Sequence, residues 1–165
     1  LVQYDPKGLF DLVEVRAALE IQSVTLAAKK ASRAGLAAIE NTIDAMQSAA
    51  HDLRSGRDVE AAERRYHDAD VGFHEALALA SGNRILTYLF EAMASPLQES
   101  FYLTRRGHEL RGHTHEHTIA AHRTILNFVR QGDARAAAEA MRTHLEDTER
   151  DIRLALGSRT AALRG

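Results

Sequence analysis

Apolar residues recur at intervals of three and four along nearly the whole chain, which is the spacing of amphipathic helices. No run alternates apolar and polar residues as a half-buried strand does. The breaks in the pattern contain Gly, Asn, Asp or Ser, which end or cap helices. The pattern predicts six helices, over residues 9–31, 34–53, 59–80, 84–103, 114–130 and 134–156, and Pro96 should kink or divide the fourth. We therefore expect an all-α fold, an antiparallel bundle of about six to seven helices joined by short turns.

Three segments lack this helical pattern. Residues 1–8 begin without Met and are interpreted as a linker from a preceding domain that is missing here. Residues 105–112 are interpreted as a polar loop, and residues 157–165 as a frayed C-terminal tail. The helical domain itself should span residues 9–156.

Composition narrows the possible functions. The chain has 165 residues, the size of one domain. Its 21 Lys and Arg residues nearly balance 23 Asp and Glu residues, which argues against a nucleic-acid-binding surface on this chain. The absence of cysteine excludes disulfides, thiolate zinc sites and cysteine nucleophiles, and it is compatible with a cytoplasmic location. No apolar run approaches the ~20 residues of a membrane span, so we expect no membrane contact.

Four residues form a candidate metal site. Asp70 and His74 are four residues apart in D-x-x-F-H, so one helix presents both on the same side. His122 and His144 each lie beside an apolar stripe on a different predicted helix. One carboxylate and three imidazoles that face a bundle interior fit a mononuclear site for a divalent metal. The alternative is that these histidines are hydrogen-bonded core residues, and the spacing alone leaves both interpretations open.

The other histidines offer weaker candidates. His67, three residues before Asp70, is a reserve ligand, and His115 shares the helix face of His122. The rest are interpreted as exposed to solvent: His51, His108, His113 and His117. Common enzyme motifs such as H-E-x-x-H and the phosphate-binding loop are absent. The adjacent pair His67-Asp68 occurs in helical metal-dependent phosphohydrolases, so a hydrolase that uses the same four ligands is the alternative function.

Several short motifs occur in a defined order. They are E-V-R-A-A-L-E at residues 14–20, D-V-G-F-H at 70–74, A-S-G-N at 80–83, H-R-T-I-L at 122–126, G-D at 132–133 and M-R-T-H-L at 141–145. With these motifs, nearly the whole chain resembles the C-terminal effector-binding domain (FCD domain) of FadR-subfamily GntR transcription regulators. The resemblance implies a homodimer that carries a winged helix-turn-helix DNA-binding domain at its N-terminus. It also implies that Asp70, His74, His122 and His144 bind a metal, although Ala121 stands where the family often has a non-ligand Glu.

The expected function is therefore a ligand-sensing domain of a bacterial regulator and not an enzyme. Zinc is the first expectation for the metal, and nickel, manganese, cobalt or iron would also accept these ligands. The resemblance implies a small organic acid as effector, such as a hydroxy acid, a sugar acid or a dicarboxylate. Arg16, in the E-V-R motif, would clamp the carboxylate of the effector; the alternative is a surface arginine paired with Glu20. Asn83 would also bind the effector, although helix capping explains this residue equally well.

Overall fold

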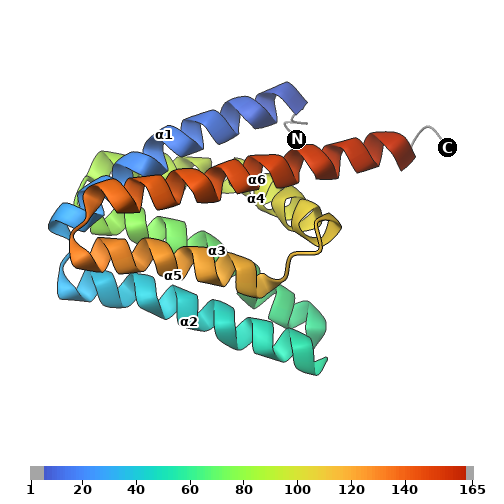
Figure 1. The fold of residues 1–165 in the computed structure, drawn as a ribbon, viewed down its shortest axis with the longest axis horizontal. Helices are drawn as coiled ribbons and strands as arrows, with labels where there is room; N and C mark the ends of the chain where they lie inside the picture. Colours follow the sequence, from blue (N-terminus) through green and yellow to red (C-terminus); the bar gives the residue numbers. More distant parts are fainter. Residues whose placement is uncertain (1–5, 163–165) are drawn as a thin grey trace.

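The computed structural model describes residues 6–162, with the side chains of residues 7–93 and 100–158. Six helices make up almost all of this part of the chain. They are α1 (Pro6–Lys30), α2 (Arg33–Ser55), α3 (Val59–Ala80), α4 (Arg84–Leu110), α5 (His115–Gln131) and α6 (Ala134–Ala162) (Figure 1). Residues 6–162 contain no strand, so the all-α prediction is confirmed. None of the described helices is both long and apolar enough to cross a membrane.

Except between α4 and α5, the turns form where the sequence predicted them. Ser32 caps α2 by accepting a hydrogen bond from the backbone N–H of Gly35 (3.1 Å). Gly56 and Gly132 follow the ends of α2 and α5 with φ of 67° and 74°, a left-handed conformation that glycine adopts without strain. These short turns reverse the chain, so that α2 lies beside α3 and α5 beside α6.

Three helices are longer than predicted. α4 continues through most of the expected loop at residues 105–112 and ends at Leu110, and α6 continues through the expected frayed tail to Ala162. α1 begins at Pro6, inside the segment that we interpreted as a linker. The same three helices pack against one another beside these extensions: Leu9 and Val13 of α1, Leu103 of α4 and Ile152 and Ala155 of α6 form one buried apolar cluster. Local sequence did not show this mutual burial, which stabilises all three helices.

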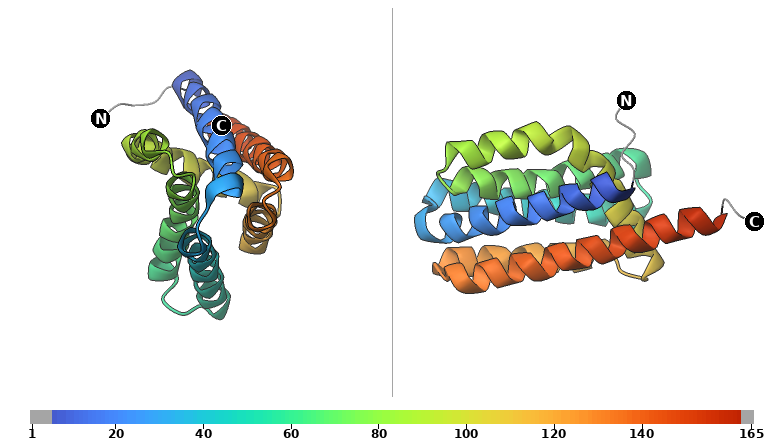
Figure 2. Two further views of the ribbon diagram at one scale, coloured as in Figure 1. Left: turned by 90° about the vertical axis from the view of Figure 1, so that its left-hand side faces the viewer. Right: turned by 90° about the horizontal axis from the view of Figure 1, so that it is seen from above.

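The last turns of α4 cross the second half of α6 at close range. A Cβ atom on Gly107 would lie 1.9 Å from the backbone oxygen of Asp151, so only glycine fits at this crossing. The backbone of α4 stays continuous and bends along its length, as the position of Pro96 led us to expect (Figure 2). The bend directs the second half of α4 across α6 (Figure 2).

The main core lies between five of the helices. Its largest fully buried members include Ile39, Ile43, Met46, Phe73, Leu77, Ile125 and Met141. Phe73 directly precedes His74, and Ile125 lies one turn after His122. The core thus fixes the helices that carry the candidate ligands.

Candidate metal centre

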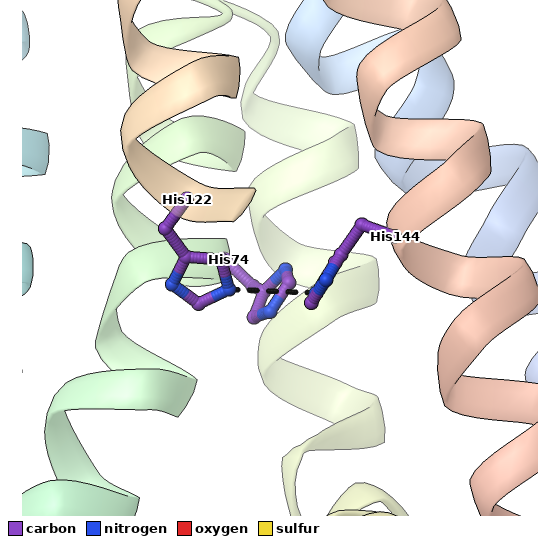
Figure 3. Close-up of side chains that lie close together, drawn as sticks. All are labelled: His74, His122 and His144. Atoms are coloured by element: carbon purple, nitrogen blue, oxygen red, sulfur yellow. Dashed lines mark hydrogen bonds between the residues drawn. The ribbon is translucent and has the colours of Figure 1, made fainter. Parts of the chain in front are cut away.

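Three histidines from three helices meet inside the bundle. His74 of α3, His122 of α5 and His144 of α6 each offer a ring nitrogen, and these nitrogens all lie within 4.8 Å of one another. The Nε2 atoms of His122 and His144 are 3.4 Å apart. In Figure 3 the rings of His122 and His144 point toward one another, with His74 between them in this view. The structure therefore brings together three residues that are spread over 70 positions of the sequence, from His74 to His144.

The carboxylate of Asp70 lies beside this group, next to His122, although among the described residues only the three histidines bring ligand atoms within 4.8 Å of one another. Asp70 lies on α3, one helical turn before His74, and its Oδ1 atom is 3.5 Å from Nε2 of His122. This oxygen is buried and has no hydrogen-bond partner among the described residues. Burial raises the pKa of the Asp70 carboxyl, although the positive charges of His74 and Arg16 partly oppose this. A buried carboxylate oxygen without a donor is costly, so the position favours a cation.

Two of the histidine rings, those of His122 and His144, are held in their neutral form. Burial lowers the pKa of His122 well below its ordinary value, and the neighbouring rings of His144 and His74 lower it further. Burial, with the charges of His74 and Arg16, lowers the pKa of His144 to about 3. Both rings are therefore neutral at pH 7 and can offer a lone pair, as a metal ligand must. The ring of His122 stacks on Phe73 with centroids 3.8 Å apart, which fixes its orientation.

A buried ionic group from α1 contacts His74. Glu20 accepts hydrogen bonds from Nε of Arg16 and from Nδ1 of His74, while Nη2 of Arg16 lies 3.2 Å from Nε2 of His74. Arg16 and Glu20 are only 1% and 2% exposed. Burial acts to raise the pKa of Glu20, but the charges of Arg16 and His74 outweigh it and lower this pKa to about 2. A carboxylate that binds the second nitrogen of a histidine ligand orients the ring and makes it more basic.

The structure bears on the two interpretations of Arg16, as an effector clamp or as a surface arginine paired with Glu20. The pairing with Glu20 exists, but Arg16 is buried, so the interpretation as a surface arginine is wrong. Its guanidinium lies over the ring of Phe101, 4.5 Å from the centroid, and its Nη1 has no hydrogen-bond partner in the described part of the chain. Sequence reasoning noted Glu20 only as a partner of Arg16 and missed its contact with the candidate ligand. The four-residue spacing was the available signal, but it could not show that the pair faces inward.

A cavity of about 340 Å³ opens onto this group. Arg16, Asp70 and His144 all line it. The rest of its wall comes mainly from α3, α4 and α5, and includes Tyr66, Phe101, Arg105, His113, His117 and Thr118. A volume of this size, with a few polar groups that converge at one end, is typical of a small-molecule site.

The structure separates Asn83 from the centre. Its side chain accepts hydrogen bonds from the backbone N–H groups of Ile85 and Leu86 and caps α4. It lines a different hollow, together with Lys30 and Tyr88. The expected effector contact of Asn83 is therefore not part of the arrangement seen here, and capping explains the residue.

The reserve histidines lie near the centre but outside the ligand group. His67 lines the cavity, and its ring packs against Phe101 with centroids 5.6 Å apart. Its neighbour Asp68 also lines the cavity, but neither residue belongs to the metal-binding group found among the described residues. His115 packs its ring on Tyr66 with centroids 4.4 Å apart.

The histidines that were expected at the surface differ among themselves. His51 and His117 are exposed, as predicted. The prediction for His108 is wrong, because it is largely buried and its Nδ1 bonds to Asp151 at 2.5 Å. His113 is half-buried, and its Nδ1 atom is inaccessible. The extension of α4 past residue 105 places His108 against α6, which explains the difference.

Comparison with known proteins gives consistent matches. Residues 11–147 match the family model of the FCD domain. The HTH-type transcriptional regulator LutR of Bacillus subtilis (strain 168) is 34% identical over 139 residues, which cover 84% of this chain and 59% of the relative. The galactonate operon transcriptional repressor of Escherichia coli (strain K12) is 27% identical, with coverage of 91% and 60%. The putative L-lactate dehydrogenase operon regulatory protein of the same strain is 29% identical, with coverage of 88% and 52%.

This chain thus spans between 52% and 60% of the length of these three curated relatives. All three carry the names of regulators, and the family model covers most of the chain. The resemblance that the ordered motifs indicated is confirmed. The chain belongs to the FCD domain family, the effector-binding domains of GntR-type transcription regulators.

Proposed function

We propose that this domain binds a divalent transition metal through Asp70, His74, His122 and His144, and that a small carboxylate effector binds beside it. Binding of the effector would then control a DNA-binding domain on the N-terminal side of the chain. The observation that carries the proposal is the group of three histidines and one buried, unpartnered carboxylate oxygen at the wall of a cavity.

The donor set fits a transition metal better than an empty polar core. Three imidazole nitrogens and one carboxylate oxygen suit zinc, which we favour, and also nickel, manganese, cobalt or iron. A dication supplies the compensating positive charge for the buried Asp70 carboxylate, whose Oδ1 has no hydrogen-bond partner among the described residues. Glu20 adds the outer carboxylate that commonly orients a histidine ligand. The chemistry that a bound metal supplies here is Lewis acidity toward a carboxylate oxygen.

Arg16 supports an anionic effector. It is buried, it lines the cavity and its Nη1 lacks a hydrogen-bond partner in the described residues. A guanidinium recognises a carboxylate through paired hydrogen bonds. One relative is named for the galactonate operon and another for the L-lactate dehydrogenase operon, and galactonate and L-lactate each carry a single carboxylate. These names support an organic acid as the effector class.

The position of Arg16 suggests how binding is transmitted. Arg16 lies on α1, while the candidate metal ligands lie on α3, α5 and α6. An acid that contacts both groups ties the first helix of this chain to the rest of the bundle. Coupling energies of about 1–3 kcal/mol are typical of allostery and suffice to change the occupancy of a DNA site. A homodimer and a cytoplasmic location belong to the same proposal, since the family resemblance implies them.

Metal binding is tested by elemental analysis and by zinc competition with a chelating dye. We expect one metal per chain and about a 100-fold loss of zinc affinity in His144→Ala. Removing a residue that only hydrogen-bonds a metal ligand lowers metal affinity by about 10–100-fold, and removing a ligand itself should lower it at least as much. His51→Ala, which removes an exposed histidine from α2, is the matched control and should bind zinc like the wild type. Equal zinc affinity in all three proteins would exclude this site.

Effector binding is tested by thermal shift with a panel of small carboxylates, on zinc-loaded and on EDTA-treated protein. A ligand at 100 times its Kd stabilises by about 2.7 kcal/mol, and only the zinc-loaded protein should show this shift. Phosphodiesterase and phosphatase assays on the same zinc-loaded sample test the hydrolase alternative. Turnover of a phosphate ester that depends on His144 would favour the hydrolase over the sensor.

A further inference from the structure

A second group of histidines lies in the same cavity, beyond the candidate metal ligands. His108 comes from the end of α4, His113 from the connection and His117 from the first turns of α5. The rings of His113 and His117 stack with centroids 4.2 Å apart, and His108 lies 5.0 and 5.6 Å from them. We call these three residues the outer histidines. All of them line the cavity that Arg16, Asp70 and His144 also line.

The outer histidines do not form a second metal site. Among the described residues, only His74, His122 and His144 bring ligand atoms close enough together to hold an ion. One nitrogen of His108 already contacts Asp151 at 2.5 Å. The outer group is therefore suited to hydrogen bonding.

His113 has unused hydrogen-bonding capacity. Its Nδ1 atom is buried and has no partner among the described residues. Burial, with the nearby charges of His117 and Arg111, lowers the pKa of His113, so its ring is neutral at pH 7. A neutral imidazole has one donor and one acceptor. A hydroxyl group, which also donates and accepts, matches it better than an ion does.

A second carboxylate would find no free cation at this end of the cavity. Three arginines, Arg64 and Arg105 in the cavity wall and Arg111 near His113, are each already paired with at least one acidic side chain. The pairs are Arg64 with Glu60, Arg105 with Glu63 (2.5 Å) and Glu109 (3.2 Å), and Arg111 with Asp151 (3.0 Å) and Asp147 (3.5 Å). Inside the bundle, by contrast, Arg16 keeps one nitrogen without a partner in the described residues. The cavity thus offers an anion site at one end and hydrogen-bonding imidazoles at the other.

The separation between the two ends sets the length of the ligand. His117 precedes His122 by five residues on α5, which is about 7–8 Å along the helix axis. With carbon–carbon bonds of about 1.5 Å and a hydrogen bond of about 2.8 Å at each end, a three-carbon acid only just reaches both ends, whereas a longer acid reaches them with carbons to spare for hydroxyl groups. The volume agrees, since at about 30 Å³ per water-sized group a cavity of about 340 Å³ holds roughly eleven such groups, about twice the content of a three-carbon hydroxy acid.

We propose that the outer histidines bind hydroxyl groups of the effector, and that the effector is a polyhydroxylated monocarboxylate of about five or six carbons. An acid of the sugar-acid type would place its carboxylate at Arg16 and the candidate metal ligands, and its hydroxyls at His113 and His117. This inference rests on the proposed function, because it assigns the ligand class of the same site.

Isothermal titration calorimetry of the zinc-loaded chain tests this assignment with three probes: gluconate, lactate and malate. We expect gluconate to bind about tenfold more tightly than either shorter acid, the equivalent of one to two net hydrogen bonds. His113→Phe keeps the ring shape but removes both nitrogens, so it should weaken gluconate binding about three- to tenfold and leave lactate binding unchanged. His117→Leu is a second variant with the same expectation, and the exposed His51→Phe is the control that should change neither.

The inference is overturned if lactate or malate binds as tightly as gluconate, or if His113→Phe and His117→Leu weaken all three acids equally. In both cases binding that still requires zinc and Arg16 leaves the proposed function intact. If none of the acids binds the zinc-loaded chain, or if the chain takes up no zinc, the proposed function fails together with this assignment.

Discussion

Replacing Glu20 by Gln removes the carboxylate that neutralises the buried guanidinium of Arg16. Both side chains are almost completely inaccessible, so water cannot take over the lost contact. The pKa of Glu20 is lowered from 4.5 to about 2, because the charges of Arg16 and His74 outweigh the opposing effect of burial. Since one pKa unit corresponds to about 1.4 kcal/mol, the charged form contributes about 3 kcal/mol to the stability of the metal-free protein at pH 7. Removal of one partner of a buried ion pair costs about 3–5 kcal/mol in other proteins, which agrees.

Guanidinium unfolding of EDTA-treated protein at pH 7, followed by circular dichroism, measures this loss directly. We expect Glu20→Gln to lower the free energy of unfolding by about 3 kcal/mol, and the melting temperature by about 6–12 °C for a domain of this size. Glu60→Gln is the matched control, because Glu60 also pairs with an arginine four residues away but is 84% exposed. It should cost less than about 1 kcal/mol. Equal losses in the two variants would show that the buried position of Glu20 adds nothing, and would refute the reasoning.

Three further predictions follow from the same structure. Gly107→Ala should destabilise the domain by about 3 kcal/mol or more, because its Cβ would lie 1.9 Å from the backbone oxygen of Asp151. Gly157→Ala, with nothing within 4 Å, should instead stabilise α6 by up to about 1 kcal/mol; equal effects in urea unfolding would contradict this. The pKa of His144 is lowered from 6.5 to about 3, chiefly by burial. Between these two pH values the His144 ring binds a proton in the unfolded chain but not in the folded protein. The full free energy of unfolding is therefore present above pH 6.5. As the pH falls toward 5, metal-free wild type should lose about 1.4 kcal/mol of this free energy per pH unit relative to His144→Gln. Parallel pH profiles of the urea midpoints of the two proteins would exclude this effect of His144. Phe73→Leu should lower zinc affinity as well as stability, because the ring of Phe73 stacks on that of His122 with centroids 3.8 Å apart. A loss of about 1 kcal/mol in stability with unchanged zinc affinity would show that Phe73 acts only as a core residue.

The helical prediction succeeded where the determining forces are local. Apolar spacing, the cap at Ser32 and the glycines at Gly56 and Gly132 act within one or two turns of helix, so one sequence contains the information. The prediction failed at residues 105–110 and 157–162, where polar composition suggested a loop and a frayed tail. At residues 105–110 the helix persists because Gly107 packs on the backbone of Asp151 and His108 bonds to the side chain of Asp151. Such pairing between distant segments leaves little trace in local composition.

The candidate site divides in the same way. The sequence by itself determined the four candidate ligands, because a four-residue spacing and an apolar stripe already fix the face of a helix on which each side chain lies. Only the tertiary structure decided that ligand atoms of His74, His122 and His144 come within 4.8 Å of one another, that Glu20 and Arg16 are buried beside them, and that Asn83 caps α4. These outcomes depend on how α1, α3, α5 and α6 are rotated and packed in three dimensions, which large numbers of weak contacts determine together and no single motif encodes.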